Sequence, residues 1–558
     1  MPPRLLLLTL AACAIALIPP AGAGEIDGFV AAKLADQGLT MQAGADRHTL
    51  LRRVTAGLTG LPPEIAEIES FAADDRPSAY RELVDRLLDD PRFGERWARH
   101  WLDVARFGES DGILTVNEDK VRGDAWRYRD AVIRAFNADL PFDQFVRLQI
   151  TGQSENPDFR ELGQFLHLGT RLQKNADPND KMFHRLDDMV ATTGSAFLAT
   201  TFGCARCHDH PVDPMSTEEY YQFTAIYFDQ FEQEAKASRR TIPLRITEPR
   251  VLKNGSWASP GAKVDPGFLR SLMAKPADHW RTGDRSDLDA LADWITDVEN
   301  GAGKQLARVI VNRLWHHHFG RGIIATPNDF GELGAAATHP ELLDWLAAEL
   351  IDKGWRLKHI HRLILNSDTY KQGAAADPAP IAIDAENRWL WQRRPQRLEA
   401  EIIRDRLLHV AGVLKPEMFG PGLPIGAYKK SVGDTPDKWR RSIYLQAHRT
   451  VRHPTLGLFD PPVSERSSGR RNTGSSPEGA LFALNSPLGW ELAGHFARRV
   501  EGEAGRVPGD QVRHAYLLAL SRPPATEELE ISLTYLQETS LTELCHVLLG
   551  LNEFIYVH

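Results

Sequence analysis

Cysteine is scarce in this sequence. The 558-residue chain has four cysteines, and one of them, Cys13, falls in an apolar stretch at the N-terminus. Without that stretch the chain keeps Cys204, Cys207 and Cys545. An odd number of thiols argues against a disulfide framework, even in an oxidising compartment. Cys545 lies in an apolar helical stretch, and we interpret it as a small buried hydrophobe.

A strong positive charge and several well-known binding and catalytic motifs are also missing. The formal net charge is −9, from 66 basic and 75 acidic residues, so the chain lacks the basic footprint of a nucleic-acid-binding protein. There is no P-loop, no G-x-G-x-x-G, no G-x-S-x-G and no H-E-x-x-H. We therefore expect no nucleic-acid partner, and any active site must rest on other residues.

Long apolar runs are absent after the N-terminus. Residues 5–18 are apolar, Arg4 precedes them and the small residues 21–23 come after them, which is typical of a secretory signal peptide over residues 1–23. The run is too short to cross a bilayer. We expect a periplasmic or secreted protein without a transmembrane span. The alternative is a lipoprotein signal ending at Cys13, which the continuation of the apolar run past Cys13 disfavours.

Helical spacing of apolar residues dominates the chain from residue 24 to about residue 235. It is clearest in residues 74–107 and 122–151. Residues 216–219 form the pattern of a capping box that opens a helix. In the second half of the chain, a strand is expected at residues 442–446.

Composition changes in the middle of the chain. Residues 236–285 show short alternating runs with Pro, Gly and Ser, which indicate a linker or a small β-containing insert. The predicted fold class is mainly α. Two helical domains, residues 24–235 and 286–558, are joined by this insert.

The most specific motif is Cys204-Ala-Arg-Cys207-His208. Cys-x-x-Cys-His is the attachment signature of c-type haem: the thiols bond the vinyl groups, and the adjacent His ligates the iron. One alternative is a zinc or iron site in which His208, His210 and Asp213 complete the ligand set, since no second Cys pair exists. The other alternative is a dithiol–disulfide pair, which usually accompanies a βαβ pattern that this chain lacks.

The second axial ligand of such a haem is open. His100 is one candidate, and a helix-surface or packed histidine is the competing interpretation. Met215 is another candidate, although methionine more often fills a core. The run His316 to His318 cannot grip one ion with all three side chains, because consecutive helical residues point about 100° apart. His317 belongs to an apolar face, so we expect it to be packed.

Two polar stretches could also serve chemistry. Asp103, Arg106 and Glu109 precede Ser-Asp-Gly at 110–112, and carboxylates there could relay protons. A solvated helix end and turn is the favoured interpretation. Residues Arg470 and Arg471 lie in a long polar loop and could bind an anionic substrate, with a solvated loop as the simpler expectation.

Several phrases in order resemble a known family. "YRELVDRLLDDPRFGERWARHWLDVARF" and "TTGSAFLATTFGCARCHDHPVDPMSTEEYYQF" resemble the planctomycete cytochrome C-type domain, over residues 47–235. "ARVIVNRLWHHHFGRGIIATPNDFGELG" and "THPELLDWLAAELIDKGWRLKHIHRLILNSDTYKQ" resemble its companion planctomycete-specific domain of unknown function, over residues 286–557.

The resemblance implies covalent haem at the Cys-x-x-Cys-His motif, and export. It implies no established reaction. Relatives resemble components of carbohydrate-degrading gene neighbourhoods, so a carbohydrate or another small molecule is the expected substrate, or else a redox partner protein. The leading hypothesis is an exported haem c protein with a redox or electron-transfer role, and enzymatic activity as a haem-dependent oxidoreductase stays open. The alternatives are a hydrolase-like zinc or iron site at the same motif and a non-catalytic envelope protein.

Overall fold

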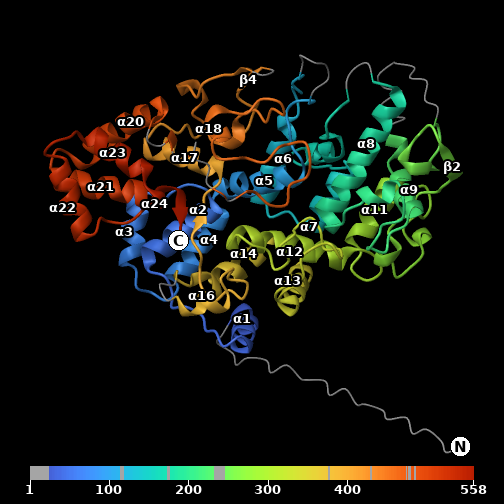
Figure 1. Cartoon of the computed structure of the whole chain (residues 1–558), viewed down its shortest axis with the longest axis horizontal. Helices are drawn as coiled ribbons and strands as arrows, with labels where there is room; N and C mark the ends of the chain where they lie inside the picture. The colour runs from blue at the N-terminus through green and yellow to red at the C-terminus, as the bar shows by residue number, and fades with distance from the viewer. Residues whose placement is uncertain are drawn as a thin grey trace, which may run out of the picture.

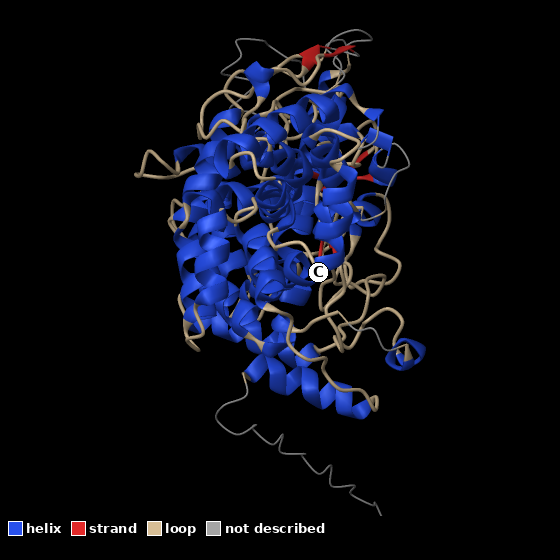
Figure 2. Cartoon of the chain, turned by 90° about the vertical axis from the view of Figure 1, so that its left-hand side faces the viewer, coloured by secondary structure: helices blue, strands red, loops and turns tan. Residues whose placement is uncertain are grey.

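The computed structural model describes residues 24–558 except 113–118, 173–175, 231–245, 375–377, 428–429, 473, 475–478, 480 and 483–484. Helices fill most of the body of the molecule, and the described strands are few and short (Figure 2). The expected signal peptide and Cys13 lie outside the described residues. No described helix has both the length and the apolar character that a bilayer crossing needs.

The N-terminal part of the chain is helical. Pro91 comes directly after the N-cap Asp90, whose side chain accepts a hydrogen bond from the backbone of Arg92, so the periodic stretch at 74–107 divides into two helices here. The elements are α1 (Glu25–Asp36), α2 (Arg47–Leu58), α3 (Ile65–Ala73), α4 (Ala79–Asp89), α5 (Pro91–Val104), α6 (Trp126–Asn137), α7 (Phe142–Thr151) and η1 (Arg160–His167).

The middle of the chain contains the Cys-x-x-Cys-His motif and the β-containing insert. Strands β1 and β2 pair antiparallel inside residues 236–285, where a β element is expected from the sequence. The elements are α8 (Pro178–Thr193), η2 (Gly194–Leu198), η3 (Gly203–Arg206), α9 (Thr217–Ala225), β1 (Arg250–Leu252), η4 (Lys253–Gly255), β2 (Pro260–Lys263), η5 (Arg270–Leu272) and η6 (Ala277–His279).

Helices resume at residue 287. The elements up to the C-terminal group are α11 (Asp287–Thr296), α12 (Gly303–Phe319), α13 (Pro340–Asp352), α14 (Leu357–Asn366), α15 (Asp368–Lys371), α16 (Ala379–Ile383), β3 (Gln396–Arg397), α17 (Ala400–Val410), β4 (Gly426–Ala427), β5 (Lys430–Ser431), η7 (Pro436–Lys438), η8 (Ser442–Tyr444) and α18 (Pro454–Gly457). The last elements are α20 (Pro487–Ala504), α21 (Pro508–Leu520), α22 (Thr526–Tyr535), α23 (Leu541–Gly550), α24 (Asn552–Ile555) and β6 (Tyr556–Val557).

Two hydrophobic clusters make up most of the core. The larger runs from Ile26 in α1 to Tyr444 in η8, so helices from both halves of the sequence share it. The second joins α17 to the C-terminal helices α20, α21 and α23, which form the group at the left of Figure 1. Helices α5 and α12 lie between that group and α8, α9 and α11 on the right. The shared core places side chains from distant parts of the sequence against one another.

The fold class predicted from the sequence is confirmed: the structure is mainly helical. The described residues form only three two-stranded sheets, β1–β2, β3–β6 and β4–β5. The strand expected at 442–446 is wrong. Residues Ser442–Tyr444 form a 3-10 turn, and only Leu445 makes an isolated bridge, with Leu423. The Ser442 backbone N–H donates to Oδ1 of Asp405 at 2.7 Å, so a side chain, and not the backbone of a neighbouring strand, accepts this hydrogen bond.

Candidate functional site

The Cys-x-x-Cys-His motif occupies a short 3-10 turn between two helices. Helix α8 continues into the π turn η2 and ends at Ala199, whose φ of 47° turns the chain away. Turn η3 then carries Cys204. Beyond the motif, Ser216 and Glu219 form the predicted capping box and start α9. The motif therefore lies at a helix end that faces a loop.

The two motif thiols are exposed and are not bonded to each other. The turn that carries them is anchored, because the Tyr221 hydroxyl donates to the Arg206 carbonyl at 2.9 Å. On the other side, Gly255 approaches Cys207 so closely that a Cβ atom there would lie 3.0 Å from the Sγ atom. These contacts restrain the backbone that carries the thiols, while their sulfur atoms remain accessible to a reagent.

His208 is exposed and its ring is oriented by the backbone. Its Nδ1 atom lies 2.8 Å from the Asp209 carbonyl oxygen. A carbonyl can only accept, so this contact favours the tautomer with the proton on Nδ1. That tautomer leaves Nε2 with a free lone pair, which is the form that a metal-binding histidine needs.

His210 has a different environment from its neighbour. It is buried, and its Nδ1 accepts a hydrogen bond from the Asp213 backbone at 2.9 Å. The Asp213 carboxylate in turn accepts from the Glu332 backbone at 2.8 Å and so links this loop to the segment after α12. His210 and Asp213 therefore shape the loop, and His208 alone of the three stands outward beside the thiols.

Met215 lies in the main hydrophobic core and is 5% exposed, which agrees with its interpretation as a packing residue.

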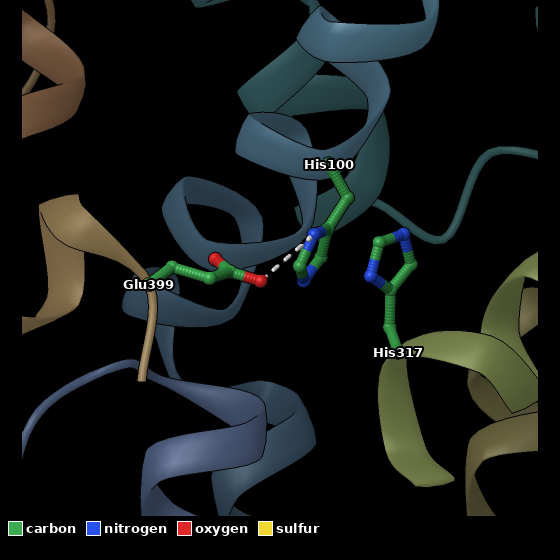
Figure 3. Close-up of side chains that lie close together, drawn as sticks. All are labelled: His100, His317 and Glu399. Atoms are coloured by element: carbon green, nitrogen blue, oxygen red, sulfur yellow. Dashed lines mark ion pairs between the residues drawn. The ribbon is translucent and has the colours of Figure 1, made fainter. Parts of the chain in front are cut away.

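His100 lies among residues that no sequence pattern connects with it. It comes from α5 and is buried, and its ring stacks on that of His317 from α12 with centroids 3.5 Å apart. Its Nδ1 atom is 3.7 Å from Oε1 of Glu399, the residue before α17. Figure 3 shows the His100 ring between the other two side chains.

These three side chains form a candidate metal-ligand group. Their ligand atoms lie within 4.8 Å of one another, and among the described residues this is the only such group of three or more His, Cys, Asp or Glu side chains. His208, His210 and Asp213 do not form one. The expectation that His317 packs is confirmed by its contact with Trp97, but His317 also faces a second histidine and a carboxylate.

Charge around this group is closely balanced. Burial, and then His317 and Arg96, hold the pKa of His100 well below its ordinary value, so the imidazole is neutral. Burial opposes ionisation of Glu399, but Arg96 and Arg471 outweigh it and lower the pKa of this carboxyl to about 2. The site thus offers neutral imidazole nitrogens and an ionised carboxylate at neutral pH.

A pocket of about 500 Å³ opens beside the group. His317, Glu399 and Arg471 belong to its wall, together with His316 and Gln396. His100 does not line the pocket, which therefore reaches the group through His317 and Glu399.

The polar segment after α5 is buried, which corrects the expectation of a solvated helix end. Arg106 is 1% exposed and donates from Nε to Asp188 Oδ1 at 2.8 Å. Glu109 accepts from the Ala447 backbone at 2.9 Å, and Ser110 accepts from the Arg449 backbone. These groups hold distant segments together, which excludes a freely solvated turn.

The long polar loop also departs from expectation. Arg470 is exposed, whereas Arg471 is half-buried, with a side chain that is 9% exposed and paired with carboxylates of α5 and α17. Only the first of these two arginines is therefore free to meet an external anion.

Both halves of the chain match models of known domain families. Residues 25–232 match PSCyt2, described as a protein of unknown function (DUF1549), and residues 288–536 match PSD1, described as a protein of unknown function (DUF1553). Both models describe planctomycete-type domains, one matching the N-terminal half of the chain and the other the C-terminal half. The region that matches PSCyt2 contains His100 and the Cys-x-x-Cys-His motif, and the region that matches PSD1 contains His317 and Glu399. No curated protein and no solved structure matches the chain.

The group of His100, His317 and Glu399 therefore draws on both matched regions. Sequence reasoning identifies His100 as a ligand candidate, but it places His317 in a packed helix and does not single out Glu399. No local spacing links residues so far apart in the chain. The run of three histidines, in a helix that faces α5, is the only signal that could have indicated the group.

Proposed function

We propose that this protein is an exported c-type haem protein with a redox or electron-transfer role. The observation that carries the proposal is the arrangement at residues 204–208: two free, exposed thiols and an exposed imidazole with an available Nε2 atom on one short turn. This donor set fits a covalent haem, because thioether formation requires accessible thiols, and ligation requires an unprotonated ring nitrogen.

Cys204 and Cys207 would anchor the haem, and His208 would hold its iron. When bound, the haem supplies one-electron chemistry at a potential that its ligands and burial set. The chain supplies the positioning. The Asp209 carbonyl fixes the His208 ring, and the Tyr221 hydroxyl fixes the backbone of the turn between the two thiols.

The partner would be a carbohydrate or another small molecule to be oxidised, or a redox protein. Exposure of the motif supports either of them, because electron transfer requires that the partner come close to the haem edge. Relatives resemble components of carbohydrate-degrading gene neighbourhoods, and this association favours a carbohydrate as the substrate.

The test is expression of the full chain with a cytochrome c maturation system, and then intact mass and a pyridine haemochrome spectrum. One covalent haem is expected, and it should be lost in a Cys204→Ser, Cys207→Ser chain but kept in a Cys545→Ser chain. An unmodified mass in the parent would overturn the proposal. Metal analysis of that haem-free sample would then test zinc or iron at the same motif.

The second axial position is tested with His100→Ala in the haem-loaded chain. The ring of His100 contacts His317 and Glu399, so we expect the haem spectrum of this variant to equal that of the parent. A change from low-spin to high-spin would instead assign His100 to the iron.

A further inference from the structure

We propose that His100, His317 and Glu399 bind a divalent transition-metal ion, at a site separate from the Cys-x-x-Cys-His motif. The three side chains meet from α5, α12 and the start of α17, with Nδ1 of His100 3.7 Å from Oε1 of Glu399. The ligand atoms of all three side chains lie within 4.8 Å of one another. Two ligands of one tetrahedral zinc ion are about 3.3 Å apart, given bonds of about 2.0–2.1 Å, so the side chains would close by up to about 1.5 Å, and the stacked rings of His100 and His317 would turn, to hold one ion.

The unsatisfied nitrogens of His100 point independently to a ligand. The side chain is 5% exposed, and neither ring nitrogen has a hydrogen-bond partner. A buried polar atom without a partner costs about 1–3 kcal/mol, and among the described histidines only His100 and His453 have both ring nitrogens in this state. A metal ion would use one of these nitrogens directly.

The carboxylate is already oriented for this role. Arg96 and Arg471 both approach Oε2 of Glu399, whereas Oε1 faces His100 (Figure 3). One oxygen is thus held by the arginines and the other remains available, which is how an outer shell of hydrogen bonds positions a metal-binding carboxylate.

Positive charge near the site does not prevent binding of a cation. Arg99 and Arg471 are paired with Asp103 and Glu401 in the same cluster. With Arg96 and Glu399, three arginines face three carboxylates, so the neighbourhood has no net charge.

The ligand set selects the class of ion. Two imidazoles and one carboxylate suit zinc or ferrous iron, and both ions use this combination with one or more coordination positions left open. The pocket of about 500 Å³ reaches His317 and Glu399 and would let water or a substrate fill the open position. This arrangement fits a catalytic site better than a closed structural one.

The test uses the full chain with Cys204→Ser and Cys207→Ser, so that neither haem nor the motif thiols take part. After chelator treatment this parent is titrated with Zn²⁺ and with Co²⁺. We expect one equivalent to bind, and Co²⁺ to give visible d–d bands without sulfur charge transfer. Failure to bind either ion would overturn the proposal, and it would leave the haem proposal untouched.

Single substitutions test which side chains bind the ion. His317→Ala and Glu399→Gln should each weaken Zn²⁺ binding by about 100-fold or more, since even outer-shell partners contribute 10–100-fold. The matched control is His453→Ala. His453 is also buried with both ring nitrogens unpartnered and lies 3.8 Å from a carboxylate, that of Asp434, but it belongs to no such group of three. Equal Zn²⁺ affinity in His317→Ala and the parent would overturn the assignment.

A measurement on the parent alone covers the case in which a variant fails to fold, as judged by far-UV circular dichroism. X-ray absorption at the zinc edge should show two imidazoles and oxygen ligands at about 2.0–2.2 Å. A first shell with fewer than two imidazoles would contradict the proposal.

Discussion

Arg471 donates from Nε to Oδ2 of Asp103 at 2.6 Å and so fastens the long polar loop to helix α5. The same guanidinium donates from Nη2 to Oε1 of Glu401 at 3.0 Å, which adds α17 to the connection. Its side chain is 9% exposed. An arginine from a loop that looks solvated in the sequence thus joins elements from both halves of the chain, next to the proposed metal group.

Arg471→Ala should therefore destabilise the fold strongly. Without Arg471, Asp103 and Glu401 share Arg99 alone, so the cluster keeps one uncompensated carboxylate. Such a loss costs about 3–5 kcal/mol. The measurement is urea unfolding of the full chain. Its neighbour Arg470 is exposed and provides the control: Arg470→Ala should stay within about 0.5 kcal/mol of the parent. Equal losses of unfolding free energy in the two variants would show that the ion pairs of Arg471 do not stabilise the fold.

The thiols should react in two classes in protein made without haem. Cys204 and Cys207 are exposed, whereas Cys545 is 0% exposed and burial raises the pKa of its thiol. A thiol reagent should modify two cysteines in the native chain and the third only after denaturation, as counted by mass spectrometry. Rapid native modification of Cys545 would mean that the second hydrophobic cluster is more open than the structure shows.

His208 and His210 should separate clearly in a haem-loaded chain. His208→Ala removes the proposed iron ligand and should change the visible spectrum. His210→Ala should leave the spectrum as it is and cost about 1–3 kcal/mol of stability, because the part-buried Asp213 N–H loses its acceptor. Visible spectra and urea unfolding of both variants test this. A changed spectrum in His210→Ala would assign chemistry to the inner histidine instead.

Local pattern predicted much of the fold and little of how its parts meet. Helical periodicity, Pro91 and the Ser216–Glu219 capping box all act within a few residues, and the structure confirms each of them. The strand expected at 442–446 failed because Asp405 captures its first backbone N–H. That capture depends on tertiary contact, which no local propensity records.

The same distinction holds for the two candidate sites. Cys-x-x-Cys-His is contiguous, so its residue types and spacing are visible in the sequence. The group of His100, His317 and Glu399 exists only because α5, α12 and α17 share one packed region, and each residue alone has an ordinary structural explanation. The buried charges at Asp103 and Arg106 were likewise expected to be solvated, since a polar turn looks the same in sequence whether or not another segment covers it.

Buried histidines should make the protein less stable in mild acid, and His361 offers a specific test. It is 0% exposed and lies 2.8 Å, Nδ1 to Nε2, from His318. Burial, and then Lys358 and Arg362, lower its pKa to about 3 in the folded chain. The unfolded chain, with an ordinary histidine pKa of about 6.5, binds the proton first. The stability that the neutral form contributes is therefore present above pH 6.5 and is lost as pH falls from 6.5 toward 3.

Between pH 7 and pH 5 this one group should lower the free energy of unfolding by about 2 kcal/mol. His361→Gln cannot titrate, so its loss of stability between the two pH values should be smaller than the parent's by that amount. Urea unfolding of both chains at both pH values gives the comparison. Taking the difference within each chain cancels whatever packing the substitution costs. If the parent and the variant lose the same amount of stability on acidification, His361 is not held neutral by its burial.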